Sequence, residues 1–132
     1  MNEGCVAYVE KETLSPREAA LLIKSAGGKV VLAHPVAYTY EDNLNDEDIL
    51  NLVKEIDAFG IEANYIYINR SDNNKKINDT KKWNMFAKKH NLVATIGSDF
   101  HDYDAVSPVI GLVGEDIDID SSYIDDVLNC LK

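Results

Sequence analysis

The chain has 132 residues, of which 45% are hydrophobic and 27% are charged, and its formal net charge is −10. This length and balance fit one soluble domain over residues 1–132, and the lack of a membrane-length apolar run or a signal-peptide pattern leads us to expect a cytoplasmic protein. The lack of such a run also argues against a membrane partner. The acidic balance argues against nonspecific nucleic-acid binding, which needs Lys and Arg, but it is compatible with a phosphorylated substrate because metal ions supply positive charge locally.

A helix is predicted to follow a short N-terminal segment, in which residues 6–9 are the one candidate for an edge strand. Ser15, Pro16 and Glu18 occupy the N-cap, first and third positions of a capping box, so the helix begins there. A glycine pair ends it. Its buried face is expected to comprise Ala19, Leu22, Ile23 and Ala26.

The glycine pair leads into a predicted strand that ends in a histidine. Residues 29–33 are mostly apolar, and His34 and Pro35 follow them directly. Proline cannot continue a hydrogen-bonded ladder and is expected to hold the residue before it in an extended conformation. The imidazole of His34 is therefore expected at the carboxyl end of this strand.

Residues 36–44 are predicted to form a loop, and a second helix is predicted from Asn45, whose first turn is acidic. Two loop tyrosines, Tyr38 and Tyr40, either contact a substrate or pack as the loop's own small core, and the second reading is favoured. The apolar stripe of the helix is expected to comprise Ile49, Leu52, Val53 and Ile56.

The next predicted strand, residues 60–66, carries a carboxylate, Glu62, inside an apolar segment. A buried charge is costly unless it is paired. Two explanations are equally supported: Glu62 approaches a metal site, or it pairs with a lysine on an edge strand.

A polar loop is predicted at residues 67–78 and a third helix at residues 79–90, with a solvated lysine face. Its buried side is expected to comprise Thr80, Trp83, Phe86, Ala87 and His90.

A strand at residues 92–96 is predicted before the most informative stretch of the chain, and a small strand at 109–113 and a helix from Ser121 close it. The aspartates of residues 116–120 imitate a calcium loop but lack its glycine and its final glutamate, so that reading is rejected. Strands alternating with helices predict an α/β fold with a mainly parallel sheet and flanking helices.

Asp99 and His101 lie just past the strand at 92–96. In extended backbone, residues two apart point the same way, so the two side chains can face one point and chelate a metal ion. An isolated pair of this kind is more often a helix cap beside an exposed histidine. His34 stands at the equivalent position of another strand, however, and parallel strands would bring all three groups to one edge of the sheet.

These motifs, Ala33-His34-Pro35 and Ser98-Asp99-Phe100-His101, resemble those of the polymerase and histidinol phosphatase (PHP) superfamily. The likeness is strongest to its small metal-dependent phosphoesterases and runs from about residue 5 to residue 113. The resemblance implies a distorted (βα)7 barrel that hydrolyses phosphate esters, either monoesters or diesters, of a small molecule or a nucleotide.

The family's motif positions correspond to three residues of this chain. The resemblance therefore implies that His34, Asp99 and His101 bind a divalent metal ion, and that Asp99 and His101 are catalytic. Glu62, Ser98 and Asp102 are expected to orient those ligands through hydrogen bonds. Imidazole and carboxylate groups suit Zn, Mn or Fe, so the identity of the metal stays open.

The family also begins with an H-x-H pair, which this chain lacks. The resemblance therefore covers the C-terminal half of such a domain, with the N-terminal ligand half absent. This leaves an alternative, in which the chain is catalytically incomplete and needs its missing half or a partner chain. A third reading, an iron oxygenase triad, is disfavoured because such triads lie on antiparallel β scaffolds.

Overall fold

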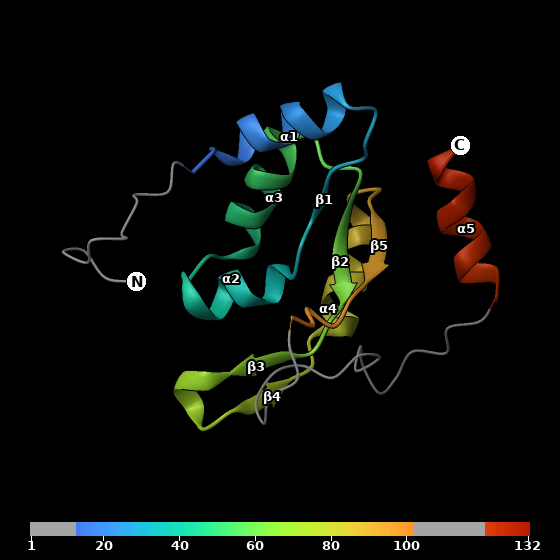
Figure 1. Ribbon diagram of the computed structural model, residues 1–132. Coiled ribbons are helices and arrows are strands. Elements are labelled where there is room, and N and C mark those ends of the chain that lie inside the picture. The colour runs from blue at the N-terminus through green and yellow to red at the C-terminus, as the bar shows by residue number, and fades with distance from the viewer. Residues whose placement is uncertain (1–12, 102–120) are drawn as a thin grey trace.

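The computed structural model describes residues 13–101 and 121–132, and its fold is α/β (Figure 1). Three parallel strands form a sheet in the order β1 (Val31–Leu32), β2 (Gly60–Asn64) and β5 (Val93–Ile96). The parallel sheet with helices around it confirms the predicted fold class. The strands predicted at 6–9 and 109–113, the segment 116–120 and Asp102 lie outside the described residues.

Four predicted helices are present: α1 (Pro16–Ser25), α3 (Asp46–Glu55), α4 (Thr80–Lys89) and α5 (Ser121–Leu131). Two of them begin at capping boxes. The Ser15 backbone N–H donates to Glu18 Oε2 at 2.8 Å, and the Glu18 N–H donates to Ser15 Oγ at 3.2 Å. At α3, the side chain of Asn45 accepts from two backbone N–H groups, each at 2.9 Å. Both starts were predicted correctly.

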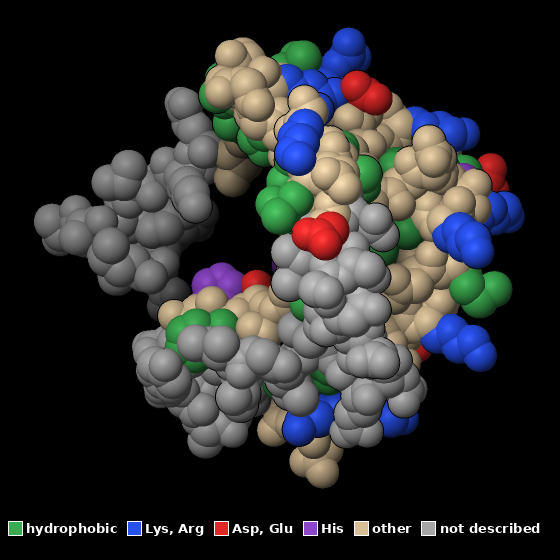
Figure 2. All heavy atoms as spheres, turned by 90° about the vertical axis from the view of Figure 1, so that its right-hand side faces the viewer, with side chains coloured by type: hydrophobic (Ala, Val, Ile, Leu, Met, Phe, Trp, Pro, Cys, Tyr) green, Lys and Arg blue, Asp and Glu red, His purple; other side chains and the backbone are tan. Residues whose placement is uncertain are grey.

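The core lies between the sheet, α3 and α4. Ile49 and Ile61 are fully buried, and α4 packs against β2 and β5. Trp83 is also buried, as the periodicity of α4 predicted, while all four lysines of that helix are exposed. Figure 2 shows Lys and Arg side chains on the surface of the molecule. The exposure of all four α4 lysines agrees with the solvated lysine face expected there. No helix among the described residues has the length and apolarity needed to cross a bilayer.

The buried face predicted for α1 is wrong. Only Ala20 of this helix is buried, whereas Leu22 is 57% exposed and Ile23 42% exposed. The physical reason is the position of α1 at one end of the molecule, where no described element packs over those side chains (Figure 1). Leu128 and Leu131 of α5 are likewise about half exposed, at 51% and 48%.

The loop predicted at 36–44 is also wrong, because α2 (Pro35–Glu41) begins directly after His34. Proline is well suited to the first helical position, since it needs no N–H donor there. His34 is the N-cap, with φ 28° and ψ 62°, and is not extended as the residue before a proline was expected to be. The preference of a residue before proline for extended backbone is overridden at His34 by a hydrogen bond from its backbone N–H to Glu62 of β2.

Residues 67–78, predicted as a polar loop, form a β-hairpin instead. It consists of β3 (Tyr67–Asn69), the single 3-10 turn η1 (Arg70–Asp72) and β4 (Lys75–Ile77). Asn73 and Asn74 both have positive φ, at 53° and 57°, and asparagine tolerates this backbone better than most residues. The chain reverses direction at this asparagine pair. The polar residues of the segment 67–78 therefore belong to a turn between two short strands.

The strands β1 and β2 are shorter than predicted, and β2 contains an irregularity where the site lies. Its pairing with β5 shifts between Glu62 and Asn64. Asn64 is buried and bridges the two strands and α4, because its Nδ2 donates to the Thr95 carbonyl at 3.3 Å while its Oδ1 accepts from Asn84 Nδ2 at 2.6 Å. Such bulges re-aim side chains and are common beside functional sites.

Candidate metal centre and adjoining pocket

The carboxyl ends of β1, β2 and β5 meet at one edge of the sheet, next to the hairpin (Figure 1). His34 follows β1, Glu62 lies near the end of β2, and Asp99 follows β5. The strands are parallel, as expected, but β2 separates the other two. His34 and Asp99 therefore stem from strands about 10 Å apart, which is two strand spacings. Glu62 comes from the strand between them.

Glu62 is tied to His34 and not to a lysine. Its Oε2 accepts the backbone N–H of His34 at 2.9 Å. Since β2 is the central strand, the edge-strand reading of Glu62 is wrong. A β-carbon at Gly97 would overlap Glu62 Oε1, so the glycine is needed for the carboxylate to lie against β5. Glu62 thus joins the ends of all three strands.

Two of the three candidate ligands have positive φ, and the value is unusual at His34. His34 has φ 28° and Asp99 has φ 52°, and aspartate tolerates the left-handed region better than most side chains. The other described non-glycine residues with positive φ are all Asn or Asp, so His34 stands out among them. Strain of this kind costs about 1–3 kcal/mol per residue and concentrates at functional sites.

The imidazole of His34 is enclosed by aromatic rings. Its ring centre lies 5.7 Å from that of Tyr38 and 5.5 Å from that of Tyr65. The Nδ1 atom is buried and has no hydrogen-bond partner among the described residues. Leaving a buried polar nitrogen unpaired is costly. A ring held in this way retains its capacity to bind a metal ion or another ligand.

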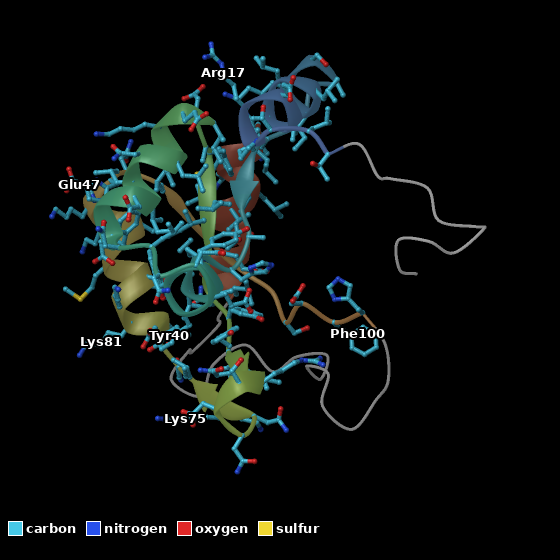
Figure 3. All side chains as sticks on the ribbon, turned by 90° about the vertical axis from the view of Figure 1, so that its left-hand side faces the viewer. Arg17, Tyr40, Glu47, Lys75, Lys81 and Phe100 are labelled. Carbon is cyan, nitrogen blue, oxygen red and sulfur yellow. The ribbon has the colours of Figure 1, made fainter. Side chains whose placement is uncertain are left out.

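Asp99 and His101 adjoin each other but do not point together at His34 in the way that extended backbone would predict. His101 is exposed. Its Nδ1 atom lies 2.8 Å from the Asp99 carbonyl oxygen and 3.5 Å from Asp99 Oδ1. The positive φ of Asp99 breaks the extended conformation on which the i, i+2 expectation depended. Figure 3 shows the segment of Phe100, between them, running away from the sheet.

The pKa values of two tyrosines are raised at this edge of the sheet, in part by the negative charge of nearby carboxylates. Burial raises the pKa of Tyr65 to about 12, and the charges of Asp99 and Glu62 add to the effect. The pKa of Tyr38 is also raised, chiefly by burial and then by nearby carboxylates that include Asp99 and Glu62. Both phenols therefore lie within the electrostatic reach of both carboxylates and stay protonated at neutral pH.

A pocket of about 280 Å³ opens beside Asp99. Besides that aspartate it is lined by Glu41, Tyr65, Tyr67, Ile68, Arg70 and Ser71. Glu41 accepts the Tyr67 hydroxyl at 2.9 Å, which fixes the end of α2 against the hairpin. The sequence did not predict this pocket, because the residues of α2 and of the hairpin were assigned to loops. The asparagine pair at 73 and 74 was the one local signal for the hairpin.

The donor types fit a divalent metal ion, but the described residues do not complete a site. His34 has an unpartnered ring nitrogen, and Asp99 is partly exposed at the same edge. Within residues 13–101 and 121–132, however, no three His, Cys, Asp or Glu side chains lie close enough to hold one ion. Ser98, which precedes Asp99 in the chain, is half-buried, and Asp102 lies outside the described residues. The ligand roles of these residues stay predictions.

Comparison with known proteins shows which proteins this chain resembles. A curated 3',5'-nucleoside bisphosphate phosphatase from Chromobacterium violaceum is 31% identical over 101 residues, which make up 76% of this chain and 33% of that enzyme. A solved protein from Bifidobacterium adolescentis, described as a candidate metal-dependent phosphoesterase, shares the fold with a TM-score of 0.60 at 20% identity. That match covers 98% of this chain and 41% of the other. No protein-family profile matches.

The predicted resemblance to PHP-type phosphoesterases is therefore confirmed. The chain spans about a third of the length of the curated relative that it matches. This partial coverage fits the prediction that the resemblance concerns one portion of such an enzyme.

Proposed function

We propose that this chain supplies part of a metal-dependent phosphoesterase that hydrolyses a phosphate ester of a nucleotide. The observation that carries the proposal is the strained His34, held through its backbone N–H by Glu62 at the carboxyl ends of parallel strands. On this proposal, the three-stranded sheet is a segment of a distorted (βα)7 barrel. Sites in parallel α/β folds gather at this edge.

The residues proposed to hold a divalent ion are His34, Asp99 and His101. When bound, such an ion lowers the pKa of a coordinated water and stabilises charge on phosphoryl oxygens. Glu62 fixes the backbone of His34, and the tyrosine rings exclude water from its imidazole. The carboxylate of Asp99 faces the pocket and would lie beside the reacting phosphate. Zn, Mn and Fe all suit these donors.

The nucleotide substrate is proposed from the relative and supported by the pocket. The printed name of the C. violaceum enzyme gives its substrate as a nucleoside bisphosphate. In this chain, the pocket beside Asp99 combines a cation, two tyrosines and a serine with acidic groups that a metal ion would neutralise. That mixture suits a phosphorylated sugar.

A second candidate function is a module that acts only together with another polypeptide. It is supported by the spacing of the strand ends, since β2 separates His34 from Asp99. Ligands from a further chain would then complete the ion site between them.

Phosphate release from adenosine 3',5'-bisphosphate in the presence of Mn²⁺ tests the proposal. We expect turnover by the wild-type chain and a loss of about 100-fold in Asp99→Asn and in His34→Ala, because each removes a proposed ligand. Asp57→Asn, which removes an exposed ion pair with Lys24, serves as the matched control. Equal turnover in all four proteins contradicts the proposal, and Mn²⁺ binding without turnover by the wild-type chain supports the second candidate.

A further inference from the structure

We propose that Arg70 is a specificity residue, which binds a phosphate group of the substrate other than the one hydrolysed. The inference rests on the proposed function and adds to it the residue that distinguishes a bisphosphate from a monophosphate. Neither the predicted ligands nor the strand ends provide a cation for such a group.

Arg70 lies in the wall of the pocket that Asp99 also lines. It is the first residue of η1, and Asn69 holds this turn in place by accepting the backbone N–H groups of Ser71 at 3.1 Å and Asp72 at 3.3 Å. The turn is anchored in a paired hairpin and is not part of an open loop. Arg70 is therefore presented from a defined position in the pocket lining that it shares with Asp99.

The guanidinium of Arg70 has no ion pair or hydrogen-bond partner among the described residues, while the acidic groups near it are engaged. Asp72 lies 3.9 Å from the Lys75 ammonium, and Glu41 accepts the Tyr67 hydroxyl. An exposed arginine that lines a pocket without an internal partner is available for a ligand. Its five N–H donors match phosphate oxygens in a two-point geometry.

The rest of the pocket explains why this one cation matters. Glu41 and Asp99 carry negative charge and would repel a phosphate that no cation neutralises. The proposed metal ion offsets charge at the Asp99 end, and Arg70 offsets it at the hairpin end. Ser71 adds a neutral hydroxyl donor beside the arginine. A substrate with two separated phosphates would satisfy both ends.

Isothermal titration of the full chain, supplied with Mn²⁺, tests the inference with phosphonate analogues of adenosine 3',5'-bisphosphate and adenosine 5'-monophosphate, which the chain cannot hydrolyse. We expect the wild-type chain to bind the bisphosphate at least about tenfold more tightly, the value of one charged hydrogen-bonded contact. Arg70→Gln should abolish that preference and leave monophosphate affinity unchanged. Arg17→Gln is the matched control, because Arg17 is the other arginine of the chain and lies far from Lys75 of the hairpin (Figure 3).

Three results would overturn the inference: equal wild-type affinity for both nucleotides, an unchanged preference in Arg70→Gln, or a parallel loss for both nucleotides in that variant. The first two, obtained while Mn²⁺ and the monophosphate still bind, leave the proposed function intact. A wild-type chain that binds neither Mn²⁺ nor either nucleotide removes both. Far-ultraviolet circular dichroism of Arg70→Gln establishes that the variant is folded.

Discussion

At the scale of single residues, the site depends on the contact between Glu62 and its neighbours on both flanking strands. Glu62 accepts the N–H of His34 after β1, and Gly97 after β5 leaves room for the same carboxylate. One side chain on the central strand thus contacts both outer strand ends. This arrangement accounts for a carboxylate inside an otherwise apolar segment.

Gly97→Ala should destabilise the protein by about 1–3 kcal/mol, because the added methyl group overlaps Glu62 Oε1. The same substitution in a Glu62→Ala background should cost at least about 0.5 kcal/mol less, since the overlapping atom is gone. Urea unfolding followed by the fluorescence of Trp83, the single tryptophan, measures both values. Identical costs in the two backgrounds would show that Gly97 acts independently of Glu62.

The phenols at the site should titrate late. The pKa of Tyr65 is raised to about 12 by burial and by nearby carboxylates, and that of Tyr67 to about 12 by burial and by its bond to Glu41, from an ordinary value of 10.0. Because the folded state holds these protons more tightly, their contribution to stability is complete below pH 10.0 and is lost as the pH rises toward 12.

Alkaline difference absorbance should therefore show a late phase of tyrosine ionisation, and Tyr65→Phe and Tyr67→Phe should each reduce that phase by one tyrosine. Ionisation of all tyrosines in a single early step, in a chain that circular dichroism shows to be folded, is the opposing result.

At the scale of elements, the capped helices differ in how much of the fold they support. Asn45 caps α3, which places Ile49 and Val53 in the core, whereas Ser15 caps α1, of which only Ala20 is buried. A cap contributes to global stability only when its helix is packed into the cooperative unit.

Asn45→Ala should lower the free energy of unfolding by about 1 kcal/mol. Ser15→Ala should mainly fray α1 and change global unfolding by less. Urea titrations report the first effect, and amide hydrogen exchange within α1 reports the second. A larger global loss for Ser15→Ala would mean that α1 is packed more firmly than its exposed leucines indicate.

Local signals predicted the elements that carry them and missed those that long-range contacts determine. The capping box at Ser15, and the acidic first turn and apolar stripe that follow Asn45, were sufficient to predict two helices. α2 was missed because His34 adopts a backbone that its neighbour Pro35 disfavours, stabilised by Glu62 from another strand. The buried face of α1 was wrong because periodicity shows that a helix is amphipathic but not whether anything covers it.

For the site, the sequence predicted the strand-end positions of His34 and Asp99, and it left open whether Glu62 approaches a metal site or pairs with a lysine. It did not predict the positive φ of Asp99, which breaks the extended conformation assumed for residues 99–101. It also missed Arg70, Tyr65 and Glu41 as residues that line the same pocket as Asp99, because they come from η1, from the connection between β2 and β3, and from α2. Such convergence leaves no spacing pattern along the chain.

At the scale of the whole molecule, the ends of the sheet and the outer helix are only partly covered by the described residues. Val31 of β1 is 38% exposed, all of β5 is half-buried, and the leucines of α1 face outward. The matched relatives are two to three times longer than this chain. A larger α/β assembly would bury these same surfaces while adding ligands at the carboxyl ends of the strands.

Calorimetric titration with Zn²⁺ of the full chain tests the central claim, a metal site at the strand ends, most directly. The account predicts one ion bound per chain, an affinity reduced by about 10- to 100-fold in His34→Ala and Asp99→Asn, and unchanged binding in the surface control Asp57→Asn. Failure of the wild-type chain to bind Zn²⁺, or equal binding by all four proteins, would contradict it.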